Sequence, residues 1–194
     1  MRIPPTLFAL ALCAASVGAA SAQQAVAPVT GNAFSGIGLA YDAPHGQLTA
    51  SGISLKPTKK SSVSNLTTGT IDVTITIRVV SRYAPGTSYP CSVMAIGGNI
   101  DLERGTVDGG IVTQNSVSPV VSTPAGNTVT CFVTLPYAWD LAGGAHESSG
   151  LIVAYAAAAV SAQGNTQRST LQVSGIEDLP ANGATTKLAF DAAL

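Results

Sequence analysis

The ten residues "IDVTITIRVV" at positions 71–80 decide the fold class of this chain. Apolar residues occupy every second position from Ile71 to Val79, and polar residues such as Asp72 and Arg78 lie between them. Successive side chains of a β-strand point to opposite faces of its sheet, and β-branched residues favour that conformation. The stretch therefore predicts a strand with one face in a core and the other in solvent.

Other short apolar stretches, separated by turn signals, predict more strands. We expect them at 51–55, 91–96, 128–135, 166–176 and 185–190, with two short strands in 99–119 separated by residues 108–110. Gly97-Gly98 and Pro136 are each expected to end a strand, because glycine weakens a strand and proline cannot donate to its ladder. With no convincing amphipathic helix, the pattern predicts an all-β, single antiparallel β-sandwich, an Ig-like or pilin-like Greek key. A small barrel is the alternative.

The segment "LIVAYAAAAV" at 151–160 is ambiguous. Alanine is the best helix former, whereas Leu-Ile-Val and Tyr155 favour a strand. Both alternate sets of side chains are apolar, as in a strand that is buried on both faces. We therefore expect a strand here.

The first residues of the chain have the pattern of an export signal. Arg2 precedes an apolar run from Leu7 to Leu12, and Ala20-Ser21-Ala22 supplies the small residues of a cleavage site. The apolar stretch is shorter than the roughly 20 residues of a membrane-spanning helix. We expect a signal peptide at 1–22 and no transmembrane segment in the mature chain. The mature protein is then expected in the periplasm, at the cell surface or in the medium.

The remaining 172 residues suit one domain by length. Residues 23–48 are rich in Ala, Gly and Pro and have no steady period, so we expect an N-terminal extension or loosely docked arm. A swap of this arm into a neighbouring molecule is left open. Residues 49–194 are expected to form the sandwich.

Two cysteines, Cys91 and Cys131, remain after the signal peptide and its Cys13 are removed. An oxidising compartment then allows one intramolecular pairing, which closes a loop of about 40 residues. On the chain-entropy model such a bridge stabilises a domain by about 4 kcal/mol. We expect a structural disulfide.

Two core-facing cysteines about 40 residues apart resemble the immunoglobulin-like pattern. In that pattern a tryptophan lies between the cysteines and a tyrosine precedes the second by two positions. Here Trp139 follows Cys131, and position 129 is Val129. The resemblance implies a sandwich architecture only.

Charge excludes one class of partner. Without Arg2, eight Lys and Arg face ten Asp and Glu, so the mature chain has a net charge near −2. No basic patch is present to bind nucleic acid through its phosphates. We therefore expect no nucleic-acid partner.

The triplet His146-Glu147-Ser148 combines a base, a carboxylate and a hydroxyl. Adjacent residues seldom align as a catalytic triad, which is assembled from separated loops, and the chain has no G-x-S-x-G motif. The other histidine, His45, lies in the expected arm. We interpret the triplet as a solvated loop and predict that the protein is not an enzyme.

Metal binding finds little support in the sequence. Two histidines without a Cys or acidic cluster do not make a zinc site. The segment 99–110 offers Asn99, Asp101, Glu103 and Asp108 as oxygen ligands, but their spacing departs from the EF-hand pattern. No metal or cofactor is expected.

Tyr137 and Trp139 are two positions apart, so they project to the same side of an extended segment. If exposed, they form a platform for a sugar ring or a partner protein. If buried, they plug one end of the sandwich beside the disulfide. We expect burial, because the chain has few aromatic residues to fill its core.

These observations favour an exported, non-enzymatic structural or interaction module of the cell envelope or exterior, such as a subunit of a surface assembly. Fimbrial subunits are similar in size and composition and lend an N-terminal strand to a neighbour. Their usual aromatic residue near the C-terminus is missing from 191–194. The alternative is a small-molecule or glycan-binding β-sandwich that uses Tyr137 and Trp139. The partner, protein or glycan, is unknown, and a homo-oligomer is compatible with either function.

Overall fold

A computed structural model describes residues 37–55, 66–101, 104–117, 127–140 and 149–194. In these ranges the chain forms β1 (Gly38–Asp42), β2 (Gln47–Ser51), β3 (Ser54–Leu55), β4 (Leu66–Arg78), β5 (Pro90–Asp101), β6 (Thr106–Val117), β7 (Thr128–Asp140), β8 (Ser149–Val160), β9 (Thr166–Glu177) and β10 (Thr185–Ala193). The same ranges contain no helix long and apolar enough to cross a membrane.

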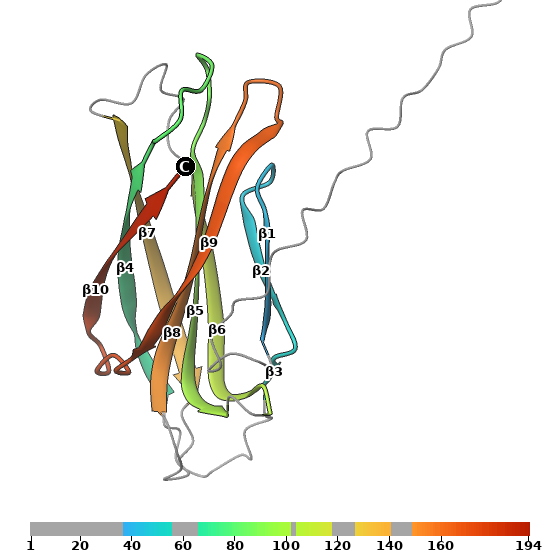
Figure 1. Ribbon diagram of the computed structural model, residues 1–194. Coiled ribbons are helices and arrows are strands. Elements are labelled where there is room, and N and C mark those ends of the chain that lie inside the picture. Colours follow the sequence, from blue (N-terminus) through green and yellow to red (C-terminus); the bar gives the residue numbers. More distant parts are fainter. Residues whose placement is uncertain (1–36, 56–65, 102–103, 118–126, 141–148) are drawn as a thin grey trace, which may run out of the picture.

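Two packed sheets make up the body of the molecule (Figure 1). The small sheet has the strand order β10-β4-β7, and the large sheet has the order β3-β6-β5-β8-β9. The predicted sandwich is therefore confirmed. Most neighbouring strands are antiparallel, but β10 pairs with β4 and β3 pairs with β6 in parallel, so both sheets are mixed.

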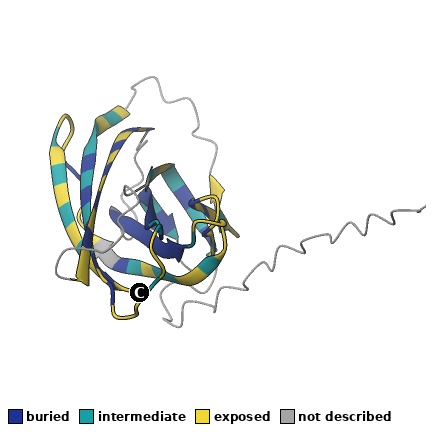
Figure 2. Ribbon diagram, turned by 90° about the horizontal axis from the view of Figure 1, so that it is seen from above, coloured by how far each residue is buried: buried dark blue, intermediate teal, exposed yellow. Residues whose placement is uncertain are grey.

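Strand β4 is the centre of the small sheet and follows the predicted alternation. Its residues Ile71, Val73, Ile75 and Ile77 are buried, and their neighbours Asp72 and Thr74 are not. Seen along the sandwich, the buried residues gather between the layers (Figure 2). The outward side chains of β4 thus lie on an open face of the molecule.

Strand β8 is an inner strand of the large sheet, between β5 and β9, and is buried on both faces, as predicted. Val153 and Tyr155 belong to the core between the two sheets. Ile152, Ala154 and Ala156 belong to a second core on the other side of the large sheet. The alanine-rich run is therefore a strand that separates two cores.

A hairpin of β1 and β2 covers this second core. Leu48 of β2 is only 4 % exposed and packs with Met94 and Ile96 of β5, while Tyr41 of β1 is partly buried against the same cluster. The hairpin forms its own two-stranded sheet. The boundary predicted after residue 48 falls inside β2, and residues 37–48 of the predicted arm belong to this docked hairpin. Residues 23–36 lie outside the described ranges.

Two side-chain hydrogen bonds, one partly buried and one buried, supplement this packing. The Tyr41 hydroxyl donates to the Pro90 carbonyl oxygen at 3.2 Å, and the buried Ser92 hydroxyl donates to the Gly46 carbonyl oxygen. Burial raises the pKa of Tyr41 well above its usual value. The hairpin therefore depends on side-chain packing and on a few hydrogen bonds for its position.

We expect Leu48→Ala to lower the free energy of unfolding by about 2–3 kcal/mol, because it removes the deepest side chain of the hairpin from the second core. Chemical denaturation followed by circular dichroism measures this loss. Thr49→Ala, at the neighbouring exposed position, is the control and should change stability by less than about 0.5 kcal/mol. Equal losses in the two variants would contradict the docked hairpin.

The glycine pairs at 97–98 and 109–110 do not end strands, and the prediction that they do was wrong. Strand β5 continues through Gly97-Gly98 to Asp101, and 106–117 is one strand, β6, not two. The two glycine pairs face each other across β5 and β6. A Cβ on Gly98 or Gly109 would collide with the opposite backbone, so these residues allow close approach of two strands.

The prediction that Pro136 ends its strand was also wrong. Strand β7 continues through Pro136 to Asp140 and pairs with β4 along its whole length. Strand β7 has one hydrogen-bonded neighbour, because it is an edge strand of the small sheet. An edge strand tolerates a proline whose missing donor would have pointed away from the sheet.

Candidate functional site

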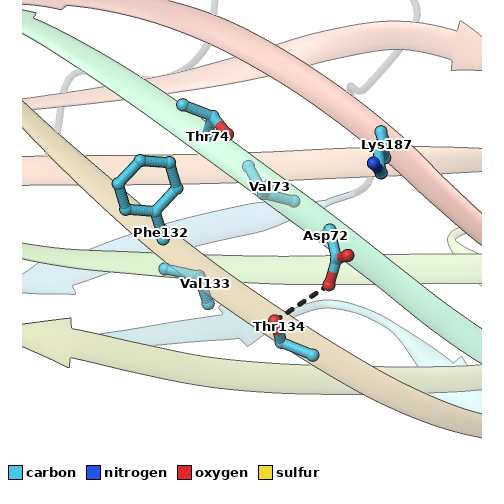
Figure 3. A pocket seen from close by; sticks show the side chains of 7 residues that line it. All are labelled: Asp72, Val73, Thr74, Phe132, Val133, Thr134 and Lys187. Atoms are coloured by element: carbon cyan, nitrogen blue, oxygen red, sulfur yellow. Dashed lines mark hydrogen bonds between the residues drawn. The ribbon is translucent and has the colours of Figure 1, made fainter.

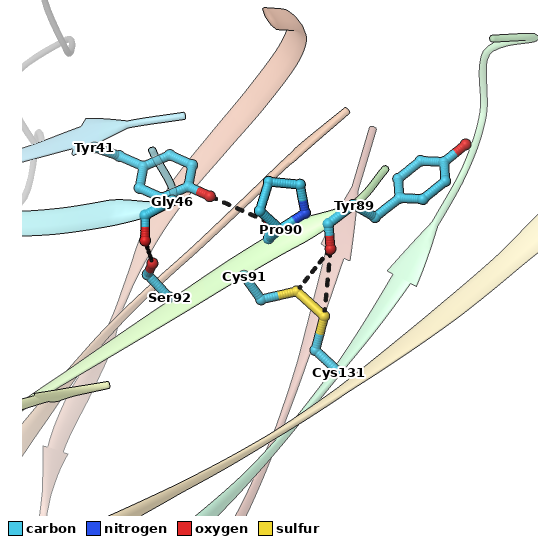
Figure 4. The surroundings of a disulfide bond; sticks show 7 residues. All are labelled: Tyr41, Gly46, Tyr89, Pro90, Cys91, Ser92 and Cys131. Atoms are coloured by element: carbon cyan, nitrogen blue, oxygen red, sulfur yellow. Dashed lines mark hydrogen bonds between the residues drawn. A yellow bond between two sulfur atoms is a disulfide. The ribbon is translucent and has the colours of Figure 1, made fainter. Parts of the chain in front are cut away.

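The two predicted disulfide cysteines connect the two sheets. Cys91 lies on β5 of the large sheet, Cys131 lies on β7 of the small sheet, and their Cα atoms are 6.6 Å apart with the sulfur atoms bonded. Both residues are almost fully buried. The Tyr89 carbonyl oxygen lies 3.6 Å from the Cys91 sulfur and 3.8 Å from the Cys131 sulfur (Figure 4). The bridge is a structural element inside the core.

Tyr137 and Trp139 are buried, as the sequence predicted. They are 5 % and 3 % exposed, and their rings stack with centroids 4.3 Å apart and an angle of 28° between the planes. Burial raises the pKa of the Tyr137 hydroxyl. We call this pair the aromatic plug. Neither ring offers the exposed face that a binding platform needs.

Glycines make the space that the aromatic plug fills. A Cβ on Gly97 of β5 or on Gly110 of β6 would overlap the indole ring of Trp139. A Cβ on Gly69 of β4 would collide with the Tyr137 hydroxyl. The aromatic plug therefore packs closely against the glycines of both sheets at the end of β7 and stabilises the contact between the sheets.

The polar residues with potential for metal binding or acid–base chemistry do not form a site in the described ranges. Among those residues, no three His, Cys, Asp or Glu side chains lie close enough to hold a metal ion. Asn99 and Asp108 face each other across β5 and β6, while Asp101 accepts a hydrogen bond from the Arg104 backbone N–H at 3.0 Å. His45 lies in the β1–β2 turn with its Nδ1 2.7 Å from the Asp42 carboxylate, and both side chains are largely exposed.

The three residues of the catalytic hypothesis, His146, Glu147 and Ser148, lie outside the described residues, as does Glu103 of the calcium hypothesis. The prediction that the protein is not an enzyme therefore stays a prediction.

The outward side of the small sheet is an open surface that no other described layer covers. We call it the outer face and define it by the outward side chains of β4, β7 and β10. Its polar members are mainly threonines: Thr70, Thr74, Thr76, Thr128, Thr130, Thr134 and Thr185. Threonine is favoured in strands and keeps a hydroxyl in solvent. The outer face is thus rich in hydroxyl groups and is supported from below by the disulfide-linked core.

Phe132 interrupts this hydroxyl surface on its edge strand, β7. It lies on β7 opposite Thr74 and is 71 % exposed, the largest value among the exposed large hydrophobic residues of the described chain. Fully burying a phenylalanine side chain is worth about 1.5–3 kcal/mol, which this ring does not realise in the isolated chain. Phe132 therefore leaves an apolar contact area open to solvent on the edge strand of the outer face.

A shallow depression of about 300 Å³ lies beside Phe132. Phe132 stands at one end, Lys187 of β10 at the other, and Asp72, Thr74 and Thr134 between them (Figure 3). The Thr134 hydroxyl donates to the Asp72 carboxylate at 2.9 Å, which fixes both side chains across β4 and β7. The depression combines one apolar ring with a negatively charged acceptor, a positively charged donor and neutral hydroxyls, which come from Asp72, Lys187 and the threonines.

The sequence patterns alone did not single out this site. The signal was present in "TVTCFVTL" at 128–135, where the alternation that places Cys131 and Val133 inside places Phe132 outside. An outward phenylalanine between two threonines is the exception in an otherwise polar set. The contributions of Asp72 and Lys187 depend on the parallel pairing of β10 with β4, which the pattern did not reveal.

Comparisons with known proteins give no family assignment: no protein-family model matches the chain, and no curated protein or solved structure is significantly similar to it.

Proposed function

We propose that this protein is an exported, non-enzymatic interaction module of the cell envelope or exterior and that the outer face of its small sheet is its working surface. The observation that carries the proposal is Phe132, a largely exposed aromatic ring on the edge strand β7 of a hydroxyl-rich strand surface. Exposed apolar groups inside a polar surround are typical of interaction sites.

Export is supported by the leader pattern at 1–22 and by the pairing of Cys91 with Cys131. Disulfides persist in oxidising compartments and are rare in the cytosol. The surface agrees with this, since charged residues make up only 10 % of the chain and threonines are the main polar residues of the outer face. A disulfide-linked sandwich of this kind can present a binding surface without a conformational change.

A binding role also suits the chemistry of the described residues. His45 pairs with Asp42 on the exposed β1–β2 turn, whereas the side chain of Ser92 is buried beneath the hairpin. General acid–base or nucleophilic catalysis needs such groups to converge on one accessible point. The outer face offers an aromatic ring, hydroxyls, a carboxylate and an ammonium group, which can bind a ligand through ring contacts and hydrogen bonds.

Fractionation of the source cells tests this function. We expect the wild-type protein outside the cytosol and bound to sedimenting surface material. Phe132→Ala should shift most of the protein to the soluble extracytosolic fraction, because the ring that makes the contact is removed. Immunoblots of each fraction measure the distribution.

Val80→Ala is the matched control, because Val80 is also a largely exposed apolar residue but lies beyond the end of β4. This variant should distribute like the wild type. A cytosolic wild-type protein, or an unchanged distribution of Phe132→Ala, would contradict the proposal.

A further inference from the structure

We propose that the depression beside Phe132 binds a neutral carbohydrate chain, with one sugar ring resting on the Phe132 side chain. This inference rests on the proposed function and names the chemical class of its partner. It follows from the kinds of groups that line the depression and from their arrangement on the three strands.

The aromatic ring supplies the apolar half of the site. A pyranose ring presents a face of C–H groups that packs on an aromatic ring, and Phe132 on edge strand β7 has such a ring free in solvent. Along β7 its outward neighbours are Thr130 and Thr134, and across the sheet it faces Thr74. None of these small side chains covers the ring, so a sugar can reach it.

The polar half of the site lies on the next row of the sheet. Lys187, Asp72 and Thr134 stand side by side on β10, β4 and β7, in register. Neighbouring strands are about 4.8 Å apart, and outward residues repeat about every 6.7 Å along a strand. A sugar over Phe132 therefore lies nearest to the hydroxyls of Thr74 and Thr134. The Asp72 carboxylate and the Lys187 ammonium group are one and two strands further across the sheet, where further units of a sugar chain can reach them.

The mixture of donors and acceptors selects a neutral, hydroxylated ligand. Sugar hydroxyls both donate and accept, so they can donate to the Asp72 carboxylate and accept from the Lys187 ammonium and the threonines. The two charges offset each other in one row of the sheet. A polyanion would be attracted by the Lys187 ammonium group and repelled by the Asp72 carboxylate. A cation would be attracted by Asp72 and repelled by Lys187.

The shape of the site favours a chain over a free monosaccharide. The depression is open and lies on the outer face of the sheet, and the hydroxyl groups of this face continue along β4 and β7 on both sides of Phe132. Enclosed pockets bury most of a small ligand, which this surface cannot do. Several units of a sugar chain would share the contacts between Phe132 on β7 and Lys187 on β10.

Titration by NMR tests the inference on the purified, oxidised protein. The probes are three hexasaccharides: β-1,4-linked glucose, β-1,4-linked N-acetylglucosamine and, as the charged comparison, α-1,4-linked galacturonic acid. We expect at least one neutral hexasaccharide to shift the backbone amide signals of 72–74, 132–134 and 187. Phe132→Ala should weaken this binding at least tenfold, whereas Phe132→Tyr, which keeps the ring, should stay within about threefold of the wild type.

Val80→Ala is again the control and should bind like the wild type. Thermal melts of each variant, run in parallel, should agree within a few degrees, because both substituted side chains are largely exposed. Binding of the galacturonic acid chain alone, shifts centred away from the outer face, or equal binding by Phe132→Ala would overturn the inference.

The outcome also separates the two proposals. If Phe132→Ala releases the protein from cell-surface material but no hexasaccharide shifts the outer face, the partner is not a carbohydrate of these classes, and the interaction function stands without this inference. If neither effect occurs, both proposals fall.

Discussion

Replacing Trp139 by alanine is expected to lower the free energy of unfolding by about 3–5 kcal/mol, one of the two largest losses of stability that we predict for this chain. The indole is 3 % exposed, stacks on Tyr137 and lies in space that Gly97 and Gly110 leave open. Its removal leaves a cavity between the two sheets that the neighbouring backbone cannot fill. Urea denaturation measures the loss.

Phe132→Ala is the matched control for this loss, since it deletes another aromatic side chain of β7 that is exposed. It should cost less than about 1 kcal/mol. Trp139 is the only tryptophan of the chain, so the emission of the wild type should be blue-shifted and poorly quenched by iodide. Red-shifted, readily quenched emission from the folded protein would show that the aromatic plug is open to water.

Loss of the disulfide is the second large expected effect. The double variant Cys91→Ala/Cys131→Ala frees a loop with a sequence separation of 40 residues, which should lower the free energy of unfolding by about 4 kcal/mol. For a domain of this size the melting temperature should fall by about 8–16 °C. Calorimetry of the oxidised wild type and the double variant measures the difference.

Reduction of the wild type should reproduce most of this fall, and the double variant should be insensitive to reductant. A wild-type melting temperature that does not change on reduction would mean that the sheets are held together without the bridge.

Much of the fold could be predicted because alternation is local. The runs at 71–79 and 151–160 carry their burial pattern within one strand, and β4 and β8 confirm both predictions. The interior position of Cys131 followed from the same rule. Strands β4 and β8 could be predicted because their side chains alternate between the two faces of a sheet, and this alternation is visible within each strand's own sequence.

The errors came from residues whose role depends on a distant partner. In the sequence Gly97 and Gly110 resemble strand breaks. In the structure they leave space for Trp139, which comes from the other sheet. Pro136 resembles a strand end until β7 is known to be an edge strand. Single-strand patterns hold no information about these contacts between sheets.

The candidate site was hidden for the same reason. The alternation of β7 could have predicted that Phe132 is exposed. Asp72 and Lys187 lie near Phe132 only because β7 pairs with β4 and β4 pairs with β10. Asp72 and Lys187, 115 positions apart in the sequence, become neighbours in one row of the sheet. Tyr137 and Trp139 are more conspicuous in the sequence, but their proximity there reflects a shared place in the core.

The intact mass of the protein isolated from its source cells, measured without reductant, tests the central claim most directly. The claim is that the chain acts outside the cytosol as a sandwich whose two sheets are linked by one disulfide. We predict a chain that begins at Gln23, is two hydrogen atoms lighter than its dithiol form and takes up a thiol-alkylating reagent only after reduction. A chain that still carries residues 1–22 and has both Cys91 and Cys131 free to alkylate would contradict it.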